Sequence, residues 1–277
     1  MKLTESVEAI AATDSLSEGE EIYKRVDENG VSLQCLSTGV SQADIATTNP
    51  LYVQFMYGLW TSVSGDNAAD GYSSKTFDDG NILYFGDTTV QDEFNKSSGY
   101  DPKLTAETIR VMNVWMAMTT ELYRSTALCR NGYVDRLSAS FNPVDFAAAL
   151  YFGTATDPDL VNTLDSNGGL YAWAKRAGNQ FVDESVGVND EIIFKLKDLQ
   201  KSFQDCRGLS REDRESKGLT MRDSVKEITN LMTVPMVQNF LGHLASQVGF
   251  PPDLDDGIIE LIDLNSATVG ANRRRRA

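Results

Sequence analysis

The sequence predicts an all-α protein, a helical bundle built from two diverged copies of one helical unit and joined by long irregular loops. Three observations predict this class. Apolar residues recur at helical spacing along much of the chain. Few segments show the period-two alternation that is typical of strands. Two stretches also repeat the same motifs in the same order. We expect a single domain over 1–277, with helical units at 31–132 and 133–250 and an acidic then basic tail at 251–277.

The repeat consists of Asn-Pro, an apolar segment with Tyr and Gly, a polar loop and the pattern M-x-V-x-M. The first copy begins at 49–58 and closes at 112–116, and the second begins at 142–153 and closes at 232–236. A duplicated unit predicts a pseudo-symmetric bundle, with any site in its interior or at its seam. An extra helix near 188–206 enlarges only the second copy, so we expect an asymmetric site.

The first unit and the segment before it alternate between helical and irregular patterns. Residues 4–30 have helical composition and end at the stop signal Asn29-Gly30, and 31–36 fit either a strand or a helix end. Residues 64–103 are rich in Gly, Asp and Ser, and an irregular region of that length is usually functional or mobile. The clearest helix is predicted over 104–129, where a wide apolar face is typical of a central helix: Val111, Trp115, Met118 and Leu122, widened by Ile109, Met112 and Met116.

The second unit opens with helix-start chemistry. Asn142 is the expected N-cap, Pro143 the first helical residue, and Asp145 an anion in the first turn, where the helix dipole favours it. Gly153 is expected to end this helix. The other predicted elements are a helix at 168–181, an amphipathic helix from 188 to about 206, a charged linker at 209–219, and a last helix at 221–248 that Pro235 should kink.

Composition limits the classes of function. The chain has 277 residues, 41% of them hydrophobic, and a formal net charge of -15. That charge argues against nucleic-acid binding, which needs clustered Lys and Arg, and fits either a soluble acidic surface or attraction of cations. The sequence contains no run of about 18 apolar residues, so no transmembrane segment is predicted. No signal peptide is visible at the N-terminus.

Several catalytic and metal-binding patterns are absent. The single histidine, His243, excludes zinc and di-iron sites that need two histidines. There is no G-x-S-x-G elbow or phosphate-binding glycine loop, and 253–257 departs from a calcium loop. A hydrolase or redox enzyme is therefore not expected. The widely spaced Cys35, Cys129 and Cys206 leave two alternatives open: one disulfide with a free thiol, or three buried thiols.

Carboxylate chemistry remains. Glu121 lies at the edge of the apolar face of the central helix, where a carboxylate must be paired, hydrogen-bonded or metal-bound, and a salt bridge or a snorkelling position is the competing interpretation. For Asp145 the competing interpretation is that its charge stabilises the first turn of its helix through the helix dipole. Oxygen ligands from Asp and Glu, with Tyr, suit hard cations such as ferric iron, calcium or magnesium. The predicted metal ligands are therefore Glu121 and Asp145, followed by Glu107, Glu227 and His243, whereas the methionines of the repeat fit core packing.

Four segments within 104–248 carry a family resemblance. They are M-N-V-W-M at 112–116, followed by Glu121 and Cys129; A-L-Y-F-G at 149–153; L-Y-A-W-A-K-R at 170–176, followed by V-N at 188–189; and L-M-T-V-P-M-V-Q at 231–238. In order and spacing these segments resemble the iron-assimilating, low-iron- or high-CO2-inducible extracellular proteins of algae and other microbial eukaryotes. The family counterparts are M-N-V-W-M, A-F-Y-x-G, L-Y-A-L-A-x-K-R with V-N, and L-M-T-V-P-L-I-Q.

The resemblance implies a secreted or periplasmic helical protein of iron acquisition, without established catalysis. Such a protein would bind an iron ion and interact with a cell-surface or membrane uptake partner. Two departures put a metal site or a disulfide in doubt. The family's acidic pair is here Asp145-Phe146, and the cysteine expected after Arg176 is Ala177. We predict a non-enzymatic, extracytoplasmic iron-binding or iron-uptake accessory protein. The alternative is a structural or protein-interaction helical bundle that has lost the metal site.

Overall fold

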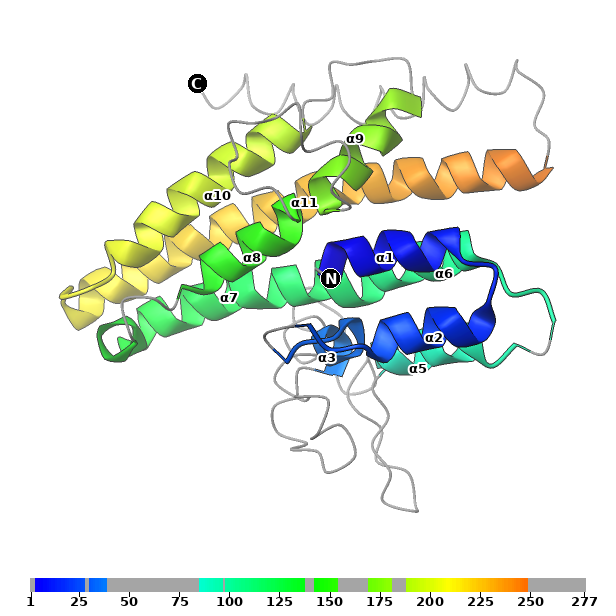
Figure 1. The fold of residues 1–277 in the computed structure, drawn as a ribbon. Helices are drawn as coiled ribbons and strands as arrows, with labels where there is room; N and C mark the ends of the chain where they lie inside the picture. Colours follow the sequence, from blue (N-terminus) through cyan, green and yellow to red (C-terminus); the bar gives the residue numbers. More distant parts are fainter. Residues whose placement is uncertain are drawn as a thin grey trace, which may run out of the picture.

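The computed structural model describes residues 3–27, 30–38, 85–96, 98–137, 142–153, 169–180 and 188–248, and within these ranges every regular element is a helix (Figure 1). The predicted all-α helical bundle is therefore confirmed. The start of the first repeat copy, 49–58, and the tail, 251–277, lie outside the described residues. The duplication accordingly stays a prediction.

The central helix, predicted over 104–129, runs from residue 102 to residue 130. It consists of α6 (Pro102–Ile109), a π-helical segment η1 (Arg110–Trp115) and α7 (Met116–Arg130). Asp101 begins it, because its carboxylate accepts hydrogen bonds from the backbone N–H groups of Lys103 and Leu104, both at 3.0 Å. The π-helical segment was not predicted. Segments of this kind are rare and occur frequently at functional sites.

The N-terminal helices are α1 (Leu3–Ala12), α2 (Leu16–Lys24), α3 (Leu33–Thr38) and α5 (Phe85–Phe94). The helical pattern of 4–30 is split in two, because the Ser15 hydroxyl caps α2 by accepting from Glu18 N. The apolar stretch 31–36 contributes to a helix and not to a strand. The prediction of an irregular region was wrong for 85–94. There Val90 and Phe94 are fully buried, although the Gly, Asp and Thr of the first turns resemble a loop.

The C-terminal half contains a short 3-10 turn, η2 (Tyr133–Arg136), and the helices α8 (Pro143–Phe152), α9 (Leu170–Gln180), α10 (Val188–Gln204) and α11 (Arg211–Val248). Asn142 caps α8 by accepting from Val144 N at 3.0 Å, and Gly153, at a φ of 72°, ends it as predicted. The predicted apolar stripe of α10 is buried: Val188, Ile192, Leu196, Leu199 and Phe203. Each such side chain contributes roughly 1.5–3 kcal/mol through burial.

The prediction of a charged linker at 209–219 was wrong. Helix α11 already begins at Arg211, and it continues through Pro235. Ser210 sits before the first turn, where its hydroxyl accepts from Asp213 N and donates to the Asp213 carboxylate. The charged composition of this segment therefore reflects an exposed helix start. A kink at Pro235 stays a prediction.

One contiguous cluster of buried side chains connects the N-terminal helices to the C-terminal ones. Helix α7 packs against α8 and α11, α9 and α10 pack against α11, and α1 packs against α6. The largest fully buried side chains include Trp115 on the central helix and Trp173 on α9. In the part of the chain that the structure describes, no helix is long and apolar enough to span a membrane.

Candidate functional site

Glu121, the first of the predicted metal ligands, is buried on α7 and is 9% exposed. Its carboxylate pairs with Arg124, three residues later on the same helix, at 3.2 Å. Burial raises the pKa of Glu121 above its usual value, while the charge and hydrogen bond of Arg124 oppose that rise. The ion pair is the competing interpretation that the sequence left open. It satisfies the carboxylate without a metal.

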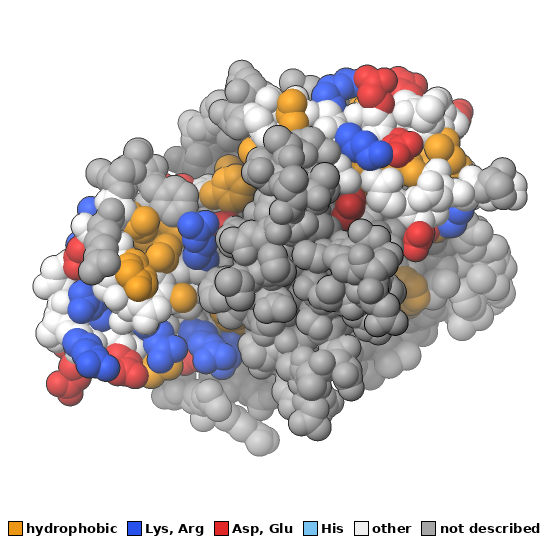
Figure 2. All heavy atoms as spheres, turned by 90° about the horizontal axis from the view of Figure 1, so that it is seen from below, with side chains coloured by type: hydrophobic (Ala, Val, Ile, Leu, Met, Phe, Trp, Pro, Cys, Tyr) orange, Lys and Arg blue, Asp and Glu red, His pale blue; other side chains and the backbone are white. Residues whose placement is uncertain are grey.

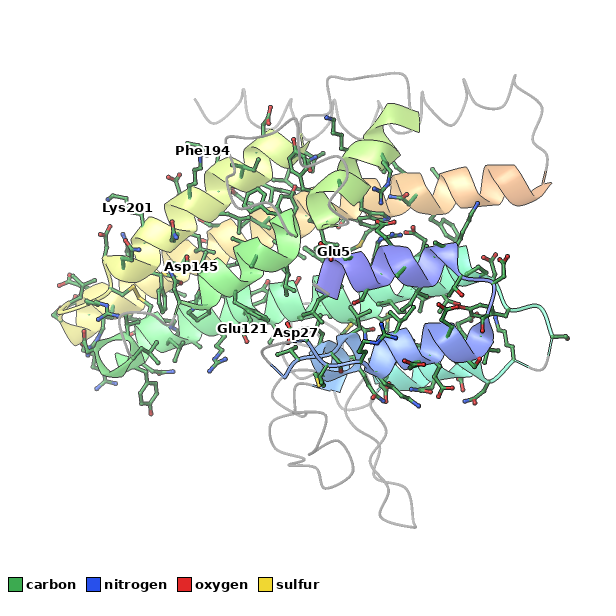
Figure 3. All side chains as sticks on the ribbon, in the orientation of Figure 1. Glu5, Asp27, Glu121, Asp145, Phe194 and Lys201 are labelled. Atoms are coloured by element: carbon green, nitrogen blue, oxygen red, sulfur yellow. A yellow bond between two sulfur atoms is a disulfide. The ribbon has the colours of Figure 1, made fainter. Side chains whose placement is uncertain are left out.

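Asp145 is exposed in the first turn of α8. Its carboxylate accepts hydrogen bonds from the side-chain amides of Asn142, at 3.1 Å, and of Gln200 on α10, at 2.5 Å. Figure 3 shows Asp145 on the side of α8 that faces α10 and Glu121 on the far side of α7. The two leading candidates are therefore not brought together.

The three remaining candidates lie in other places. Glu107, on α6, pairs with Arg110 and accepts a hydrogen bond from the indole N–H of Trp173 at 2.6 Å. Glu227, on α11, is mostly exposed and pairs with Lys195 of α10. His243 lies on the α11 backbone, and its side chain is outside the described part. Within the described residues, no three His, Cys, Asp or Glu side chains gather closely enough to hold a metal ion.

Figure 2 shows the molecule from below. On the described part of this face, Lys and Arg side chains lie among Asp and Glu side chains, so the charges form no field of one sign. Although the whole chain carries a net charge of -15, the acidic residues do not form one cation-attracting surface here. Many are paired individually with a neighbouring cation, as in the pairs Glu20–Lys24, Glu21–Arg25 and Glu93–Lys96.

A buried polar cluster on the N-terminal side was not predicted, and we name it the Asp87 cluster: Tyr23, Gln34, Asp87 and Asn113. Tyr23 Oη donates to Asp87 Oδ1 at 3.0 Å, and Gln34 Nε2 lies 3.1 Å from both carboxylate oxygens. Asn113 donates to Tyr23 Oη at 2.9 Å and to the Leu33 carbonyl at 2.8 Å. The cluster thus joins α2, α3, α5 and the π-helical segment.

Electrostatics mark the Asp87 cluster as an unusual environment. Burial raises the pKa of Asp87, and hydrogen bonds from Gln34 and Tyr23 oppose the rise. Burial also raises the pKa of Tyr23 well above its usual value. Asn113 Oδ1 is buried and accepts no hydrogen bond from the described residues. A polar Asn in the middle of the apolar face of the central helix was the one signal in the sequence that could have revealed this cluster.

A second cluster joins α1, the central helix and α9. Arg110, only 4% exposed, pairs with both Glu107 and Glu8, and its bond to Glu8 measures 2.8 Å. Glu8 also pairs with Arg176 at 3.0 Å. Two cations thus meet two carboxylates, and the charges balance within the cluster. A balanced, paired set of this kind fixes the packing of helices and leaves no carboxylate free for an added cation.

The segments that carry the family resemblance are connected to one another by hydrogen bonds. Tyr151 Oη, in the A-L-Y-F-G segment, donates to Asn189 Oδ1 at 2.6 Å. Asn189, in the V-N pair, donates in turn to the Tyr171 carbonyl of the L-Y-A-W-A segment at 3.1 Å. Tyr151 and Tyr171 are both buried. Much of the resemblance therefore falls on residues that hold α8, α9 and α10 together.

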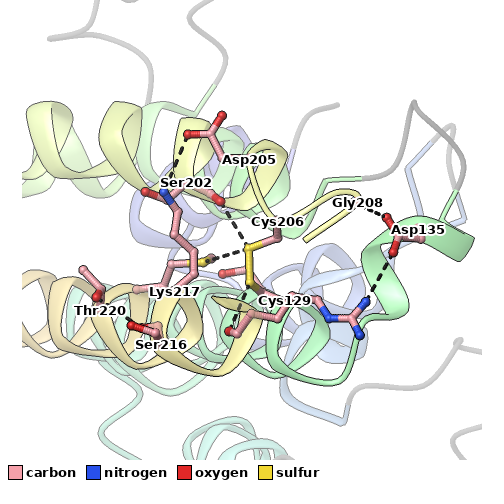
Figure 4. The surroundings of a disulfide bond; sticks show 12 residues. Cys129, Asp135, Ser202, Asp205, Cys206, Gly208, Ser216, Lys217 and Thr220 are labelled. Atoms are coloured by element: carbon pink, nitrogen blue, oxygen red, sulfur yellow. Dashed lines mark hydrogen bonds and ion pairs between the residues drawn. A yellow bond between two sulfur atoms is a disulfide. The ribbon is translucent and has the colours of Figure 1, made fainter. Parts of the chain in front are cut away.

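Cys129 and Cys206 form a disulfide across 77 positions of sequence, with their Cα atoms 5.6 Å apart (Figure 4). It ties the end of α7 to the turn between α10 and α11. Asp135 supports the same corner, because it accepts from Gly208 N at 3.0 Å and pairs with Arg214 at 3.4 Å. Cys35 is a buried thiol that takes no part in the disulfide. Of the two alternatives left open for the cysteines, the structure agrees with the one that has a single disulfide.

Comparisons with known proteins add no further constraint. No protein-family model matches this chain, and neither a curated protein nor a solved structure matches it with significant similarity. The functional interpretation therefore rests on the residues and their geometry.

Proposed function

We propose that the protein is a non-enzymatic, extracytoplasmic iron-binding or iron-uptake accessory protein. The observation that carries this proposal is the Cys129–Cys206 disulfide. Disulfides form and persist in oxidising environments, such as the periplasm and the cell exterior, and are rare in reducing compartments. The disulfide supports the location that the family resemblance implies, where iron is captured from solution and passed to a cell-surface or membrane partner.

The departures from the family pattern can be interpreted on this fold. Asp145 and Phe146 are both exposed on α8, so the acidic pair of the family would lie at the protein surface. Phe146 is 39% exposed, a position that a carboxylate would occupy at little cost. Ala177, in contrast, is fully buried. A cysteine there would enter the core, whereas the disulfide of this protein uses Cys129 and Cys206.

Two carboxylates of the described residues, the buried Glu121 and the half-buried Asp87, are the strongest candidates to contact iron. Glu121 has one partner, Arg124, and a raised pKa. Asp87 has more oxygen atoms nearby, because Tyr23 Oη bonds to it directly and lies 3.4 Å from Ser37 Oγ. Hard cations prefer such oxygen ligands. Either place supplies one carboxylate, so a bound iron ion would need further ligands from its carrier, such as citrate.

Calorimetric titration of the oxidised protein with ferric citrate, and separately with calcium, tests this proposal. Iron-specific heat is expected for the wild type. The affinity for iron should fall at least tenfold in one of the two variants Glu121→Gln and Asp87→Asn. Asp198→Asn, an exposed residue on α10, is the matched control for the loss of one negative charge. If the wild type gives no iron-specific heat, or if both of these variants retain all of it, iron binding by these residues is excluded.

A second candidate function is a structural or protein-interaction bundle that has lost the metal site. The observation that favours it is the separation of Glu107, Glu121, Asp145 and Glu227, each with its own cation or amide partner. This candidate predicts the same disulfide and the same secretion, but no heat with iron in any variant. The titration therefore separates the two.

A further inference from the structure

Asn95 begins the triplet Asn95-Lys96-Ser97, and no other asparagine of the chain is followed, two residues later, by Ser or Thr with a residue other than Pro between. This N-x-[ST] pattern is the acceptor motif for N-glycosylation in secreted proteins. We propose that Asn95 is an N-glycosylation site of this protein, an inference that rests on the proposed extracytoplasmic location. The motif is short, so its place in the fold decides whether it can be used.

The fold presents Asn95 at the surface. It is exposed in the turn that directly follows α5, and its backbone N–H bonds to the Gln91 carbonyl at 2.9 Å. Phe94, the residue before it, is 2% exposed and packs against Tyr23, with ring centroids 5.7 Å apart. The buried phenylalanine therefore anchors the end of the helix, and the asparagine after it stands at a fixed surface position. Ser97 lies outside the described residues and enters only through the sequence.

A glycan at Asn95 is compatible with the rest of the molecule. Lys96 is exposed and pairs with Glu93, so the residue that follows Asn95 leaves the approach to its side chain open. Figure 1 shows the connection from α5 to α6 at one end of the bundle, away from the turn between α10 and α11. A glycan there would leave the disulfide corner uncovered. It would also add a polar, solubilising group beside the N-terminal helices.

The modification is a group transfer. Asn95 Nδ2 forms a bond to the anomeric carbon of a sugar chain carried on a lipid diphosphate. The bond between that carbon and the phosphate oxygen breaks, the lipid diphosphate leaves, and the amide nitrogen loses one proton. The co-reactant is the lipid-linked oligosaccharide of a eukaryotic secretory pathway. The transfer consumes no oxidant or reductant.

The test is secretion of the full chain, behind a cleavable leader, from a eukaryotic host, followed by mass measurement before and after treatment with an N-glycosidase. The wild type is expected to lose the mass of one glycan. Asn95→Gln and Ser97→Ala should abolish that loss, and Ser97→Thr should keep it. Asn131→Gln, at an exposed turn without the motif, is the control that should behave as wild type. A glycosidase-sensitive mass that survives in Asn95→Gln, or no such mass on the secreted wild type, would overturn the proposal.

Thiol alkylation of the same samples separates this proposal from the one on which it rests. Secreted protein with Cys129 and Cys206 oxidised but without a glycan refutes the modification and leaves the extracytoplasmic function standing. Protein that is retained in the cell with those cysteines reduced counts against both. Ser97→Ala keeps Asn95 in place, so a loss of the glycan in this variant cannot come from a changed side chain at residue 95.

Discussion

Two regions of this bundle are held together by different chemistry. In one region, the Cys129–Cys206 disulfide joins α7 to the turn after α10, next to a fully apolar stripe on α10. On the N-terminal side, the Asp87 cluster joins four helical elements through hydrogen bonds between buried and half-buried side chains. In the first region, a covalent link is added to an apolar core. The second depends on the correct placement of each donor and acceptor.

This difference predicts how each region should respond to substitutions. A disulfide acts mainly on the unfolded chain, and its contribution grows with the length of the loop it closes. A buried hydrogen-bond network contributes little net stability, but it becomes costly when one member is removed and its partners stay buried. Loss of the disulfide should therefore lower the free energy of unfolding more, whereas the Asp87 cluster should be more sensitive to the removal of single atoms.

The largest expected effect is the loss of the disulfide. The double variant Cys129→Ala/Cys206→Ala should lower the free energy of unfolding by about 4 kcal/mol, because the bond closes a loop with a sequence separation of 77. Urea denaturation of the wild type, with and without reductant, and of the double variant measures this. Cys35→Ala, at the buried thiol outside the disulfide, controls for the loss of a thiol alone. A reduced wild type as stable as the oxidised one would contradict the expectation.

A smaller effect is expected at the Asp87 cluster from the removal of one oxygen atom. Tyr23→Phe should cost about 1–3 kcal/mol, because Asp87 then loses a donor and Asn113 loses an acceptor. Tyr100→Phe is the matched control, because the Tyr100 hydroxyl is buried and has no hydrogen-bond partner among the described residues. Its removal should be neutral or stabilising. Equal losses of unfolding free energy in the two variants would show that the network has no special role.

The same comparison shows what sequence reasoning could reach. The cap at Asn142 and the stripe on α10 were predicted, because each is a local pattern within one helix. Helix α5 and the start of α11 were missed. The first turns of α5 have the composition of a loop, and the exposed first turns of α11 have the composition of a charged linker. For α5 the burial of Val90 and Phe94 decides the structure against the local composition, whereas the start of α11 is an exposed helix that Ser210 begins.

The candidate sites divide in the same way. The pairing of Glu121 is local, because Arg124 lies one turn further along the helix, and the sequence left that interpretation open. The Asp87 cluster brings Tyr23 to Asp87 across 64 positions and to Asn113 across 90. No single helical pattern contains such a pair. Only the isolated polarity of Asn113 in an apolar face hinted at it.

The smallest effect is on the pH dependence of stability, and it is the sharpest test of the Asp87 cluster. Burial raises the pKa of Asp87 in the folded protein above its unfolded value, so the folded state binds more protons between these two values. The contribution of Asp87 to stability is therefore greatest below the unfolded pKa and decreases as the pH rises through the folded pKa.

Asp87→Asn removes this titration. The unfolding free energy of the wild type minus that of the variant should decrease from about pH 4 upward and become constant above the folded pKa of Asp87. Chemical denaturation at a series of pH values measures the difference, and Asp198→Asn controls for the loss of one negative charge at an exposed position. A difference that increases with pH would mean that hydrogen bonds from Gln34 and Tyr23 outweigh burial. The ionised carboxylate of Asp87 would then stabilise the folded protein.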